Sequence, residues 1–532
     1  MTRHSVRIAA LFVIAATRLA AQDAPAPARQ TPSLVVLITV DQMRADYLDR
    51  FASQLDGGLA RLARWGARFT NAHHDHAITE TAPGHATLLS GRFPRSTGIL
   101  ANAVGVGDDS SALLDAADGP GASPHRFRGT TLVDWIRTAE PRSRALSVSA
   151  KDRAAILPIG RSKQQVFWYV PDGRFITSRY YADTLPTWVH AFNARDLARR
   201  RAGQRWQLLL PESAYPEADS VVYEAGGIDA VFPHVVPDDS ARAADYIRVT
   251  PWIDEIVLEM ALAGLEATGI GTGAHTDVLS VSLSGTDFIG HRYGPDSREM
   301  RDQILRVDRS LGAFLDSLYT VRDSSRVAII LTSDHGVGSI PELAAERAGQ
   351  DATDVPLRVD LRTALEGGRT LLRSAEADER ALWVDGAVIG LDPAAIVGTR
   401  VNHGAVITRV LQDARKVPGV LRVDRWSDLA RASRSRDTIA RRWSHQFVRQ
   451  ASLDLVATLT PGSVYGMSVA THGTPHDYDS HVPLIFYGPR FNPGSHSGFV
   501  RTVDIAPTIA AMLGVRPTEP LDGEVLRGAL RP

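Results

Sequence analysis

The chain of 532 residues contains no cysteine. This absence excludes disulfides, thiolate zinc sites, iron–sulfur clusters and a cysteine nucleophile, so any metal must be held by His, Asp, Glu or hydroxyl oxygens. The net charge is −1, so no global basic field indicates nucleic acid as a partner. Hydrophobic residues make up 44% and charged residues 22%, which excludes a mainly disordered or fibrous chain.

Lysine is scarce as well. Of the 59 lysine and arginine residues, only Lys151, Lys163 and Lys416 are lysine. In such a chain a surface cation is almost always arginine. A lysine retained within a motif therefore suggests a role that arginine cannot fill, with chance retention as the alternative.

Long hydrophobic runs are missing too, since a bilayer span needs roughly 20 apolar residues. Arg3 and Arg7 precede the short apolar run Ile8–Ala16, which small residues follow. This order predicts a secretory signal peptide in residues 1–21, and 22–32 reads as a Pro/Ala linker. We expect a periplasmic or secreted bacterial protein without stable membrane insertion once the signal is removed. An uncleaved anchor or a buried N-terminal helix is the alternative.

Short apolar runs alternate with helical patterns in the rest of the chain. Five runs read as buried parallel strands: Leu34–Val40, Arg144–Ser149, Asp277–Leu283, Val327–Thr332 and Val482–Tyr487. Two amphipathic helices are predicted, at Ile253–Thr268 and Ser297–Tyr319. The alternation predicts an α/β fold with a mostly parallel sheet and helices on both faces. We expect one catalytic domain, 33–532, with capping insertions at about 155–245 and 340–465.

Acidic and histidine residues follow several of these strands. The strand ends supply Asp41, Asp287 with His291, Asp334 with His335, and, shortly before the last strand, His472. A single Asp after a strand is most often a helix cap or turn residue. Three Asp and three His together are unusual as turn chemistry. They could hold two zinc ions about 4 Å apart, as in two-metal phosphatases.

A candidate nucleophile lies in the segment from Thr79 to Gly91. Pro83 is favourable in the first turn of a helix that runs to about Ser90, so Thr81 would lie at or near its N-terminus. The helix dipole and a bound metal would both lower the pKa of the Thr81 hydroxyl. The alternative is that Thr81 only caps the helix.

Six segments occur in an order that resembles a known family. They are Val-Asp-Gln-Met-Arg (40–44), Thr-Ala-Pro-Gly-His (81–85), Ser-Ala-Lys-Asp-Arg (149–153), Thr-Asp-Phe-Ile-Gly-His (286–291), Ser-Asp-His-Gly (333–336) and Thr-His-Gly…His-Val-Pro (471–483). Together they resemble the alkaline phosphatase superfamily, in particular its PafA-like branch of phosphate-monoester phosphatases. The resemblance runs from about residue 34 to 515. It implies a three-layer αβα sandwich.

The resemblance also implies a di-zinc site. Its ligands would be Asp287, His291 and His472 for one ion, and Asp41, Asp334, His335 and the Thr81 oxygen for the other. The Thr-His-Gly context favours His472, while His476 and His481 stay open as replacements. The branch that this chain resembles has a lysine in comparable space to a third metal, so no Mg²⁺ site is expected.

Asn102, Lys151 and Arg153 are the residues that the resemblance assigns to the outward phosphate oxygens. A monoester has nearly two negative charges there, and a cationic pair aimed at them favours its transition state. A diester has one fewer charge and a bulky second group, so it gains less. The presence of Lys151 and Arg153 therefore predicts a monoesterase.

The sequence thus predicts an enzyme that hydrolyses small-molecule phosphate monoesters through a covalent phosphothreonine at Thr81. The first alternative is a phosphodiesterase or nucleotide pyrophosphatase of the same superfamily. A catalytically inactive phosphate- or zinc-binding protein is the alternative from another class. A sulfatase is excluded because the segment lacks the required cysteine or serine and arginine, and no Gly-x-Ser-x-Gly elbow indicates a serine hydrolase. The oligomeric state stays open.

Overall fold

The structure is a computed structural model that describes residues 31–115, 119–349 and 355–531. The predicted signal peptide, 1–21, and all but the last two residues of the predicted linker, 22–32, lie outside the described residues. Among the helices of the described part, none combines the length and the apolar character that crossing a membrane requires.

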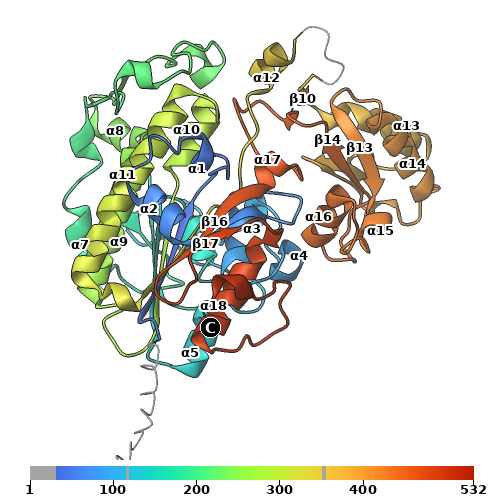
Figure 1. The fold of residues 1–532 in the computed structure, drawn as a ribbon. Coiled ribbons are helices and arrows are strands. Elements are labelled where there is room, and N and C mark those ends of the chain that lie inside the picture. The colour runs from blue at the N-terminus through green and yellow to red at the C-terminus, as the bar shows by residue number, and fades with distance from the viewer. Residues whose placement is uncertain (1–30, 116–118, 350–354, 532) are drawn as a thin grey trace, which may run out of the picture. The chain divides into compact units, whose positions relative to one another are not determined.

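A ten-stranded, mostly parallel sheet forms the centre of the fold (Figure 1). Its order is β17-β2-β16-β9-β1-β8-β3-β4-β5, with β18 beside β2. The parallel centre consists of β9 (Val327–Thr332), β1 (Leu34–Val40), β8 (Asp277–Leu283), β3 (Ala145–Ser149) and β4 (Gln165–Tyr169). The outer strands are β2 (Ala67–His73), β5 (Phe175–Ile176), β16 (His481–Tyr487), β17 (Gly494–His496) and β18 (Val500–Arg501).

One predicted parallel strand runs the other way. The run Val482–Tyr487 lies within β16, which pairs antiparallel with both β9 and β2. Its middle residues are buried because strands flank it on both sides and helices cover the sheet. An apolar run reports that burial and carries no information on strand direction, so the prediction of a parallel strand was wrong here.

Helices cover both faces of the sheet, as the alternating side chains of β1 show. Leu34, Val36 and Ile38 pack into one core, and Val35 and Leu37 pack into the other. The first core is covered by α2 (Gly58–Trp65), α9 (Trp252–Thr268), α10 (Gly285–Tyr293) and α11 (Arg298–Val321). The second is covered by α3 (Thr81–Leu88), α5 (Leu132–Ala139), α6 (Asp152–Ile156) and α18 (Ile505–Leu513). The predicted α/β sandwich is confirmed.

The segment 155–245 begins with β4 and β5, which extend the main sheet. Its remaining elements are α7 (Thr187–Asn193), β6 (Arg205–Trp206), β7 (His234–Val235) and α8 (Ser240–Tyr246). Val189, Phe192 and Trp206 of these elements join the same core as α9 and α11. This part of the chain therefore covers one helical face of the sandwich.

The segment 340–465 contains a second sheet with its own core (Figure 1). Its antiparallel strands are β11 (Leu382–Asp385), β12 (Val388–Leu391), β14 (Leu455–Leu459) and β13 (Val420–Arg425). The helices of this segment are α12 (Pro341–Ala348), α13 (Glu366–Ser374), α14 (His403–Ala414), α15 (Trp426–Leu429) and α16 (Thr438–Gln446). A smaller apolar cluster packs Val388 and Trp443 with Ala77, which lies just before α3. The second sheet is thereby attached next to the predicted nucleophile.

Candidate active site

The carboxyl ends of four neighbouring strands meet at one edge of the main sheet. Asp41 follows β1 directly, Lys151 follows β3 by two residues, and Asp334 follows β9 by two. The helix α10 begins two residues after β8. Ligand sites in open α/β sheets form at this edge, and the charged residues singled out in the sequence gather there.

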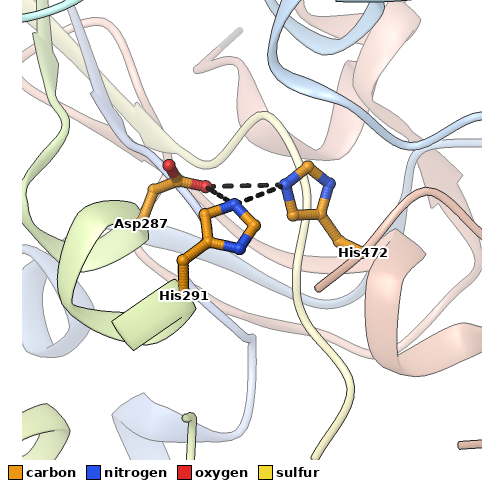
Figure 2. Close-up of side chains that lie close together, drawn as sticks. All are labelled: Asp287, His291 and His472. Carbon is orange, nitrogen blue, oxygen red and sulfur yellow. Dashed lines mark hydrogen bonds and ion pairs between the residues drawn. The ribbon is translucent and has the colours of Figure 1, made fainter. Parts of the chain in front are cut away.

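Asp287, His291 and His472 form the first group of side chains (Figure 2). Asp287 and His291 lie one turn apart on α10, so both side chains project from the same face of the helix. Asp287 Oδ1 lies 3.3 Å from His291 Nε2 and 3.6 Å from His472 Nε2. The two imidazole Nε2 atoms are 3.2 Å apart. A carboxylate oxygen and two ring nitrogens thus converge on one point, as metal ligands do.

The imidazoles of the site are held by a common pattern of hydrogen bonds. In each ring Nδ1 donates to a backbone carbonyl: His291 to Ala470 at 2.8 Å, His472 to Thr79 at 2.7 Å and His335 to Gly336 at 2.9 Å. A donating Nδ1 leaves the lone pair on Nε2, and the three Nε2 atoms face the carboxylates. Metal-binding histidines show this arrangement, which fixes both tautomer and ring orientation.

The second group surrounds His335. Asp41 Oδ1 and Asp334 Oδ2 each lie 3.5 Å from His335 Nε2, and Asp287 Oδ1 lies 4.0 Å from it. Asp41, Asp287 and His335 are close enough to share one ion. The resemblance implies Asp334 in place of Asp287 as a ligand here, and the structure brings both carboxylates within 4.0 Å of His335 Nε2. Asp287 therefore lies between the two groups.

Three carboxylates are buried close together here, and a single lysine contacts two of them, so the site favours additional positive charge. Lys151 Nζ donates to Asp41 Oδ2 at 2.6 Å and to Asp287 Oδ2 at 2.5 Å. Burial, and then repulsion by Asp287 and Asp334, raise the pKa of Asp41 well above its usual range. Asp41 Oδ1 and Asp334 Oδ2 are buried and accept no hydrogen bond; the Nδ1 of His85, 3.1 Å from Asp334 Oδ2, lies closer to the Thr81 carbonyl, at 2.9 Å. Unpaired buried carboxylate oxygens facing free imidazole nitrogens fit divalent cations.

Thr81 is the first residue of α3, and its side chain reaches the second group and Lys151. Its Oγ1 lies 3.5 Å from His335 Nε2 and 3.5 Å from Lys151 Nζ. The helix can approach this closely because Gly84 packs on the backbone of Asp334, where a Cβ would lie 2.2 Å from the carbonyl oxygen. The hydroxyl is thus presented to the positive end of the helix dipole and to the ligand cluster.

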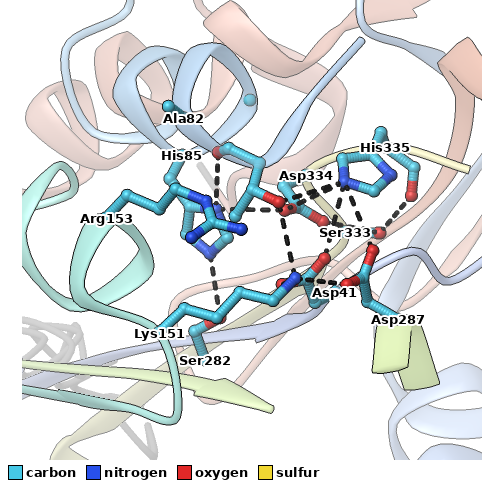
Figure 3. A network of polar contacts seen from close by, with 12 residues as sticks. Asp41, Ala82, His85, Lys151, Arg153, Ser282, Asp287, Ser333, Asp334 and His335 are labelled. Carbon is cyan, nitrogen blue, oxygen red and sulfur yellow. Dashed lines mark hydrogen bonds and ion pairs between the residues drawn. The ribbon is translucent and has the colours of Figure 1, made fainter. Parts of the chain in front are cut away.

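The other two predicted phosphate-binding residues lie next to this point. Asn102 Oδ1 accepts the Ala82 amide at 2.8 Å, so the side chain is tied to the first turn of α3. Arg153 lies on α6, two residues after Lys151, and its nearest ion pair is with Asp152 at 3.6 Å. Its charge acts on Lys151, and Figure 3 shows its side chain among the same network.

His476 and His481 take no part in either group. His476 Nε2 donates to the Leu459 carbonyl at 2.8 Å, and His481 Nε2 donates to the Thr70 carbonyl at 2.9 Å. Of the three histidines left open by the sequence, the structure brings His472 to Asp287.

Gln42 is a site residue that the sequence reasoning did not single out. Its backbone amide donates to Asp334 Oδ1 at 3.1 Å, and its Nε2 donates to Asp287 Oδ1 at 2.9 Å. Its φ of +66° is a left-handed backbone conformation that residues other than Gly seldom adopt. Gln42 therefore connects carboxylates from both groups. Its position directly after Asp41 was the available signal, but a conformation of this kind is not visible in a sequence.

Replacing Gln42 with alanine should remove the fixed orientation of Asp287. We expect metal affinity to fall by about 10- to 100-fold, the usual effect of losing a partner that orients a ligand. The measurement is a competition titration of the metal-free protein with a fluorescent zinc chelator. Gln42→Asn, which tolerates the same backbone conformation but is shorter, serves as the control for strain. Unchanged affinity in Gln42→Ala would contradict the orienting role.

His85 is a second residue of this kind. It is buried, its Nδ1 lies 2.9 Å from the Thr81 carbonyl and 3.1 Å from Asp334 Oδ2, and its Nε2 lies 2.9 Å from Ser282 Oγ (Figure 3). His85 thus joins the first turn of α3 to β8 and to the second group.

Comparisons with known proteins agree with this geometry. Residues 35–479 match the family of type I phosphodiesterases and nucleotide pyrophosphatases. The chain is 30% identical to alkaline phosphatase PhoV of Synechococcus elongatus, covering 94% of this chain and 93% of that protein. It is 31% identical to alkaline phosphatase PhoK of a Sphingomonas species, covering 93% and 91%.

A similar structure has been solved. The crystal structure of alkaline phosphatase PafA, a protein known from Elizabethkingia meningoseptica, superposes with a TM-score of 0.86 at 28% identity, over 95% of this chain and all of that one. The predicted membership of the alkaline phosphatase superfamily is confirmed. The chain belongs to the type I phosphodiesterase and nucleotide pyrophosphatase family, within its group of PafA-like alkaline phosphatases.

Proposed function

We propose that the chain is an exported di-zinc alkaline phosphatase that hydrolyses phosphate monoesters through a covalent phosphothreonine at Thr81. The observation that carries this proposal is the convergence of three Nε2 atoms and three carboxylates at one edge of the sheet, with the Thr81 hydroxyl 3.5 Å from one of those nitrogens. Each relative quoted above matches along nearly its whole length and is named an alkaline phosphatase. The chain is an enzyme of the phosphoric monoester hydrolase class, as the sequence predicted.

The residues of the site support a separate role for each in the proposed reaction. Thr81 Oγ1, at the N-terminus of α3, is positioned to attack phosphorus. The new bond forms the phosphothreonine, the bond from phosphorus to the ester oxygen breaks, and the alcohol leaves with a proton equivalent to the one that the threonine hydroxyl loses. Lys151 Nζ, beside that oxygen, would bind the outward phosphate oxygens together with Asn102 and Arg153. Water then attacks phosphorus, the bond to Oγ1 breaks, inorganic phosphate leaves, and a proton from the water restores the Thr81 hydroxyl. His85 and Gln42 keep Thr81 and the carboxylates in place.

Two divalent cations would be held by Asp287, His291 and His472, and by Asp41, Asp334 and His335. When bound, such ions lower the pKa of hydroxyl groups and of water and neutralise charge that develops on the reacting oxygens. We propose zinc because a set of imidazole nitrogens and carboxylate oxygens suits it and the cysteine-free chain offers no softer ligand. We propose no third metal site.

Removal of the metals should abolish activity and weaken the fold. Without cations the carboxylates around Lys151 repel one another, so chelation should lower the melting temperature as well as phosphate release. The measurement is thermal unfolding and turnover before and after dialysis against a chelator, followed by Zn²⁺, Mg²⁺ or Ca²⁺. Zinc should restore both best. Full activity after exhaustive chelation would contradict the proposal.

The alternative function, a phosphodiesterase or nucleotide pyrophosphatase, shares every metal ligand and the family name. The contacts of Lys151 favour the monoesterase, because a second cation beside Arg153 near the nucleophile suits a dianionic phosphate. A comparison of monoesters and diesters that share one leaving group separates the two. We also propose export to the periplasm or out of the cell, from the basic and apolar N-terminal pattern.

A further inference from the structure

A cavity of about 490 Å³ opens beside the metal-ligand cluster. Part of its lining comes from the main domain. These residues are Glu80, which precedes Thr81, and His472 with its neighbours. Another part of the lining comes from the second sheet, through Trp383 of β11, Ala387 in the β11–β12 turn, and Leu453 before β14. A volume of this size holds a small organic molecule.

The position of the cavity relates it to the reaction. Glu80, the residue before Thr81, lines the cavity, and so do Ala101 and Ala103, which flank Asn102. His472 is at once a wall residue of the cavity and a partner of Asp287 and His291. The cavity thus borders both the start of the nucleophile helix and the ligand group of His472, so a group attached to a phosphate at Thr81 can extend into it.

The walls are suited to an uncharged ring. Four large apolar side chains line the cavity: Trp383, Phe447, Leu100 and Ile78. Three of them, Trp383, Leu100 and Ile78, are only partly buried. Among the described residues that line it, none is lysine or arginine, and Glu80 and Asp385 place carboxylates there. A second phosphate or a carboxylate on the substrate would meet no lysine or arginine in this lining and would be repelled by Glu80 and Asp385.

Trp383 is held in place by its partner strand. It pairs with Gly390 of β12, where a Cβ would lie 2.3 Å from the indole Cζ2. The ring thus lies across a residue without a side chain, and a larger residue there would displace it. Aromatic side chains fixed in this way stack on flat ligand groups without a further loss of conformational freedom.

From these observations we propose that the cavity binds the alcohol portion of the substrate and selects phosphate monoesters with an uncharged aromatic group there. The proposal rests on the proposed function, because it assumes that phosphate binds at Thr81. It extends that function by assigning the second sheet, through Trp383, a part in substrate selection.

The test compares benzyl phosphate with methyl phosphate, whose leaving alcohols have similar basicity. In the metal-loaded full chain, Trp383→Ala should lower kcat/KM for benzyl phosphate by about tenfold and for methyl phosphate by less than twofold, since one aromatic contact is lost. Trp383→Phe, which keeps an aromatic ring, should retain most of the wild-type kcat/KM for benzyl phosphate. Trp65→Ala, which removes an exposed tryptophan of α2, is the matched control and should change neither substrate.

A second variant tests the cavity by filling it. Ala387→Trp adds bulk in a turn and leaves Trp383 in place, so it should also lower kcat/KM for benzyl phosphate and spare methyl phosphate. Equal fold-changes for both substrates in Trp383→Ala and Ala387→Trp would overturn the proposal. Thermal unfolding of each variant reports whether the fold has been kept.

Binding of phosphonates separates failure of this inference from failure of the proposed function. Benzylphosphonate should bind the wild-type protein more tightly than methylphosphonate in calorimetry, and Trp383→Ala should remove the difference. If the wild-type protein hydrolyses neither ester, the proposed function fails, and the phosphonates still test the cavity. If both esters are hydrolysed but the phosphonates bind equally, the cavity assignment alone is overturned.

Discussion

Replacing Thr81 with alanine should lower kcat/KM for phosphate monoesters by at least about 10³-fold and abolish the phosphothreonine intermediate. The hydroxyl oxygen lies 3.5 Å from His335 Nε2 and 3.5 Å from Lys151 Nζ. Water in its place would lack the orientation that α3 gives to Thr81. The measurement combines steady-state turnover with acid quenching after brief exposure to ³²P-labelled substrate.

Thr81→Ser is the matched variant, because it keeps the oxygen and removes only a methyl group. It should retain a labelled intermediate, now on serine, and most of the activity. Thr81→Ala and Thr81→Ser should unfold at temperatures close to that of the wild type. Near-normal turnover in Thr81→Ala, or a label that stays on the protein without the hydroxyl, would remove Thr81 from the mechanism.

Much of this arrangement could be predicted because the residues follow strands. A run such as Leu34–Val40 is recognisable from its apolar residues, and a parallel sheet brings the residues after its strands to one edge. Asp41, Asp334 and Lys151 are close together for that reason. The one-turn spacing of Asp287 and His291 likewise follows from the geometry of a helix.

Other features depend on contacts that local sequence does not encode. The direction of β16 is set by its pairing with β9 and β2, which its apolar composition does not report. The left-handed backbone of Gln42 is held by Asp334 and Asp287, which come from distant parts of the chain. The cavity beside His472 exists only because the second sheet packs near α3. Sequence patterns predicted the elements better than their contacts.

The second large effect concerns Lys151 and Arg153. Replacing both with alanine should lower kcat/KM for a phosphate monoester by about 10⁴-fold, because each removes a charged donor that stabilises the transition state. The same variant should lose about tenfold or less on a diester with the same leaving group, because a diester has one negative charge and its second group occupies the space. The expected result is therefore a change in substrate preference and a loss of rate.

The structure also predicts how the Lys151 effect can be separated from instability. In the metal-free protein Lys151 neutralises Asp41 and Asp287, so Lys151→Ala should lower the free energy of unfolding by about 3 kcal/mol there, as loss of one partner in a buried ion pair does. In zinc-loaded protein the loss should be much smaller, since the cations take over that charge. Lys163→Ala, at an exposed lysine, is the control and should change neither property. If the zinc-loaded and stably folded double variant lost equal factors of kcat/KM on the monoester and the diester, Lys151 and Arg153 would not determine the preference for monoesters.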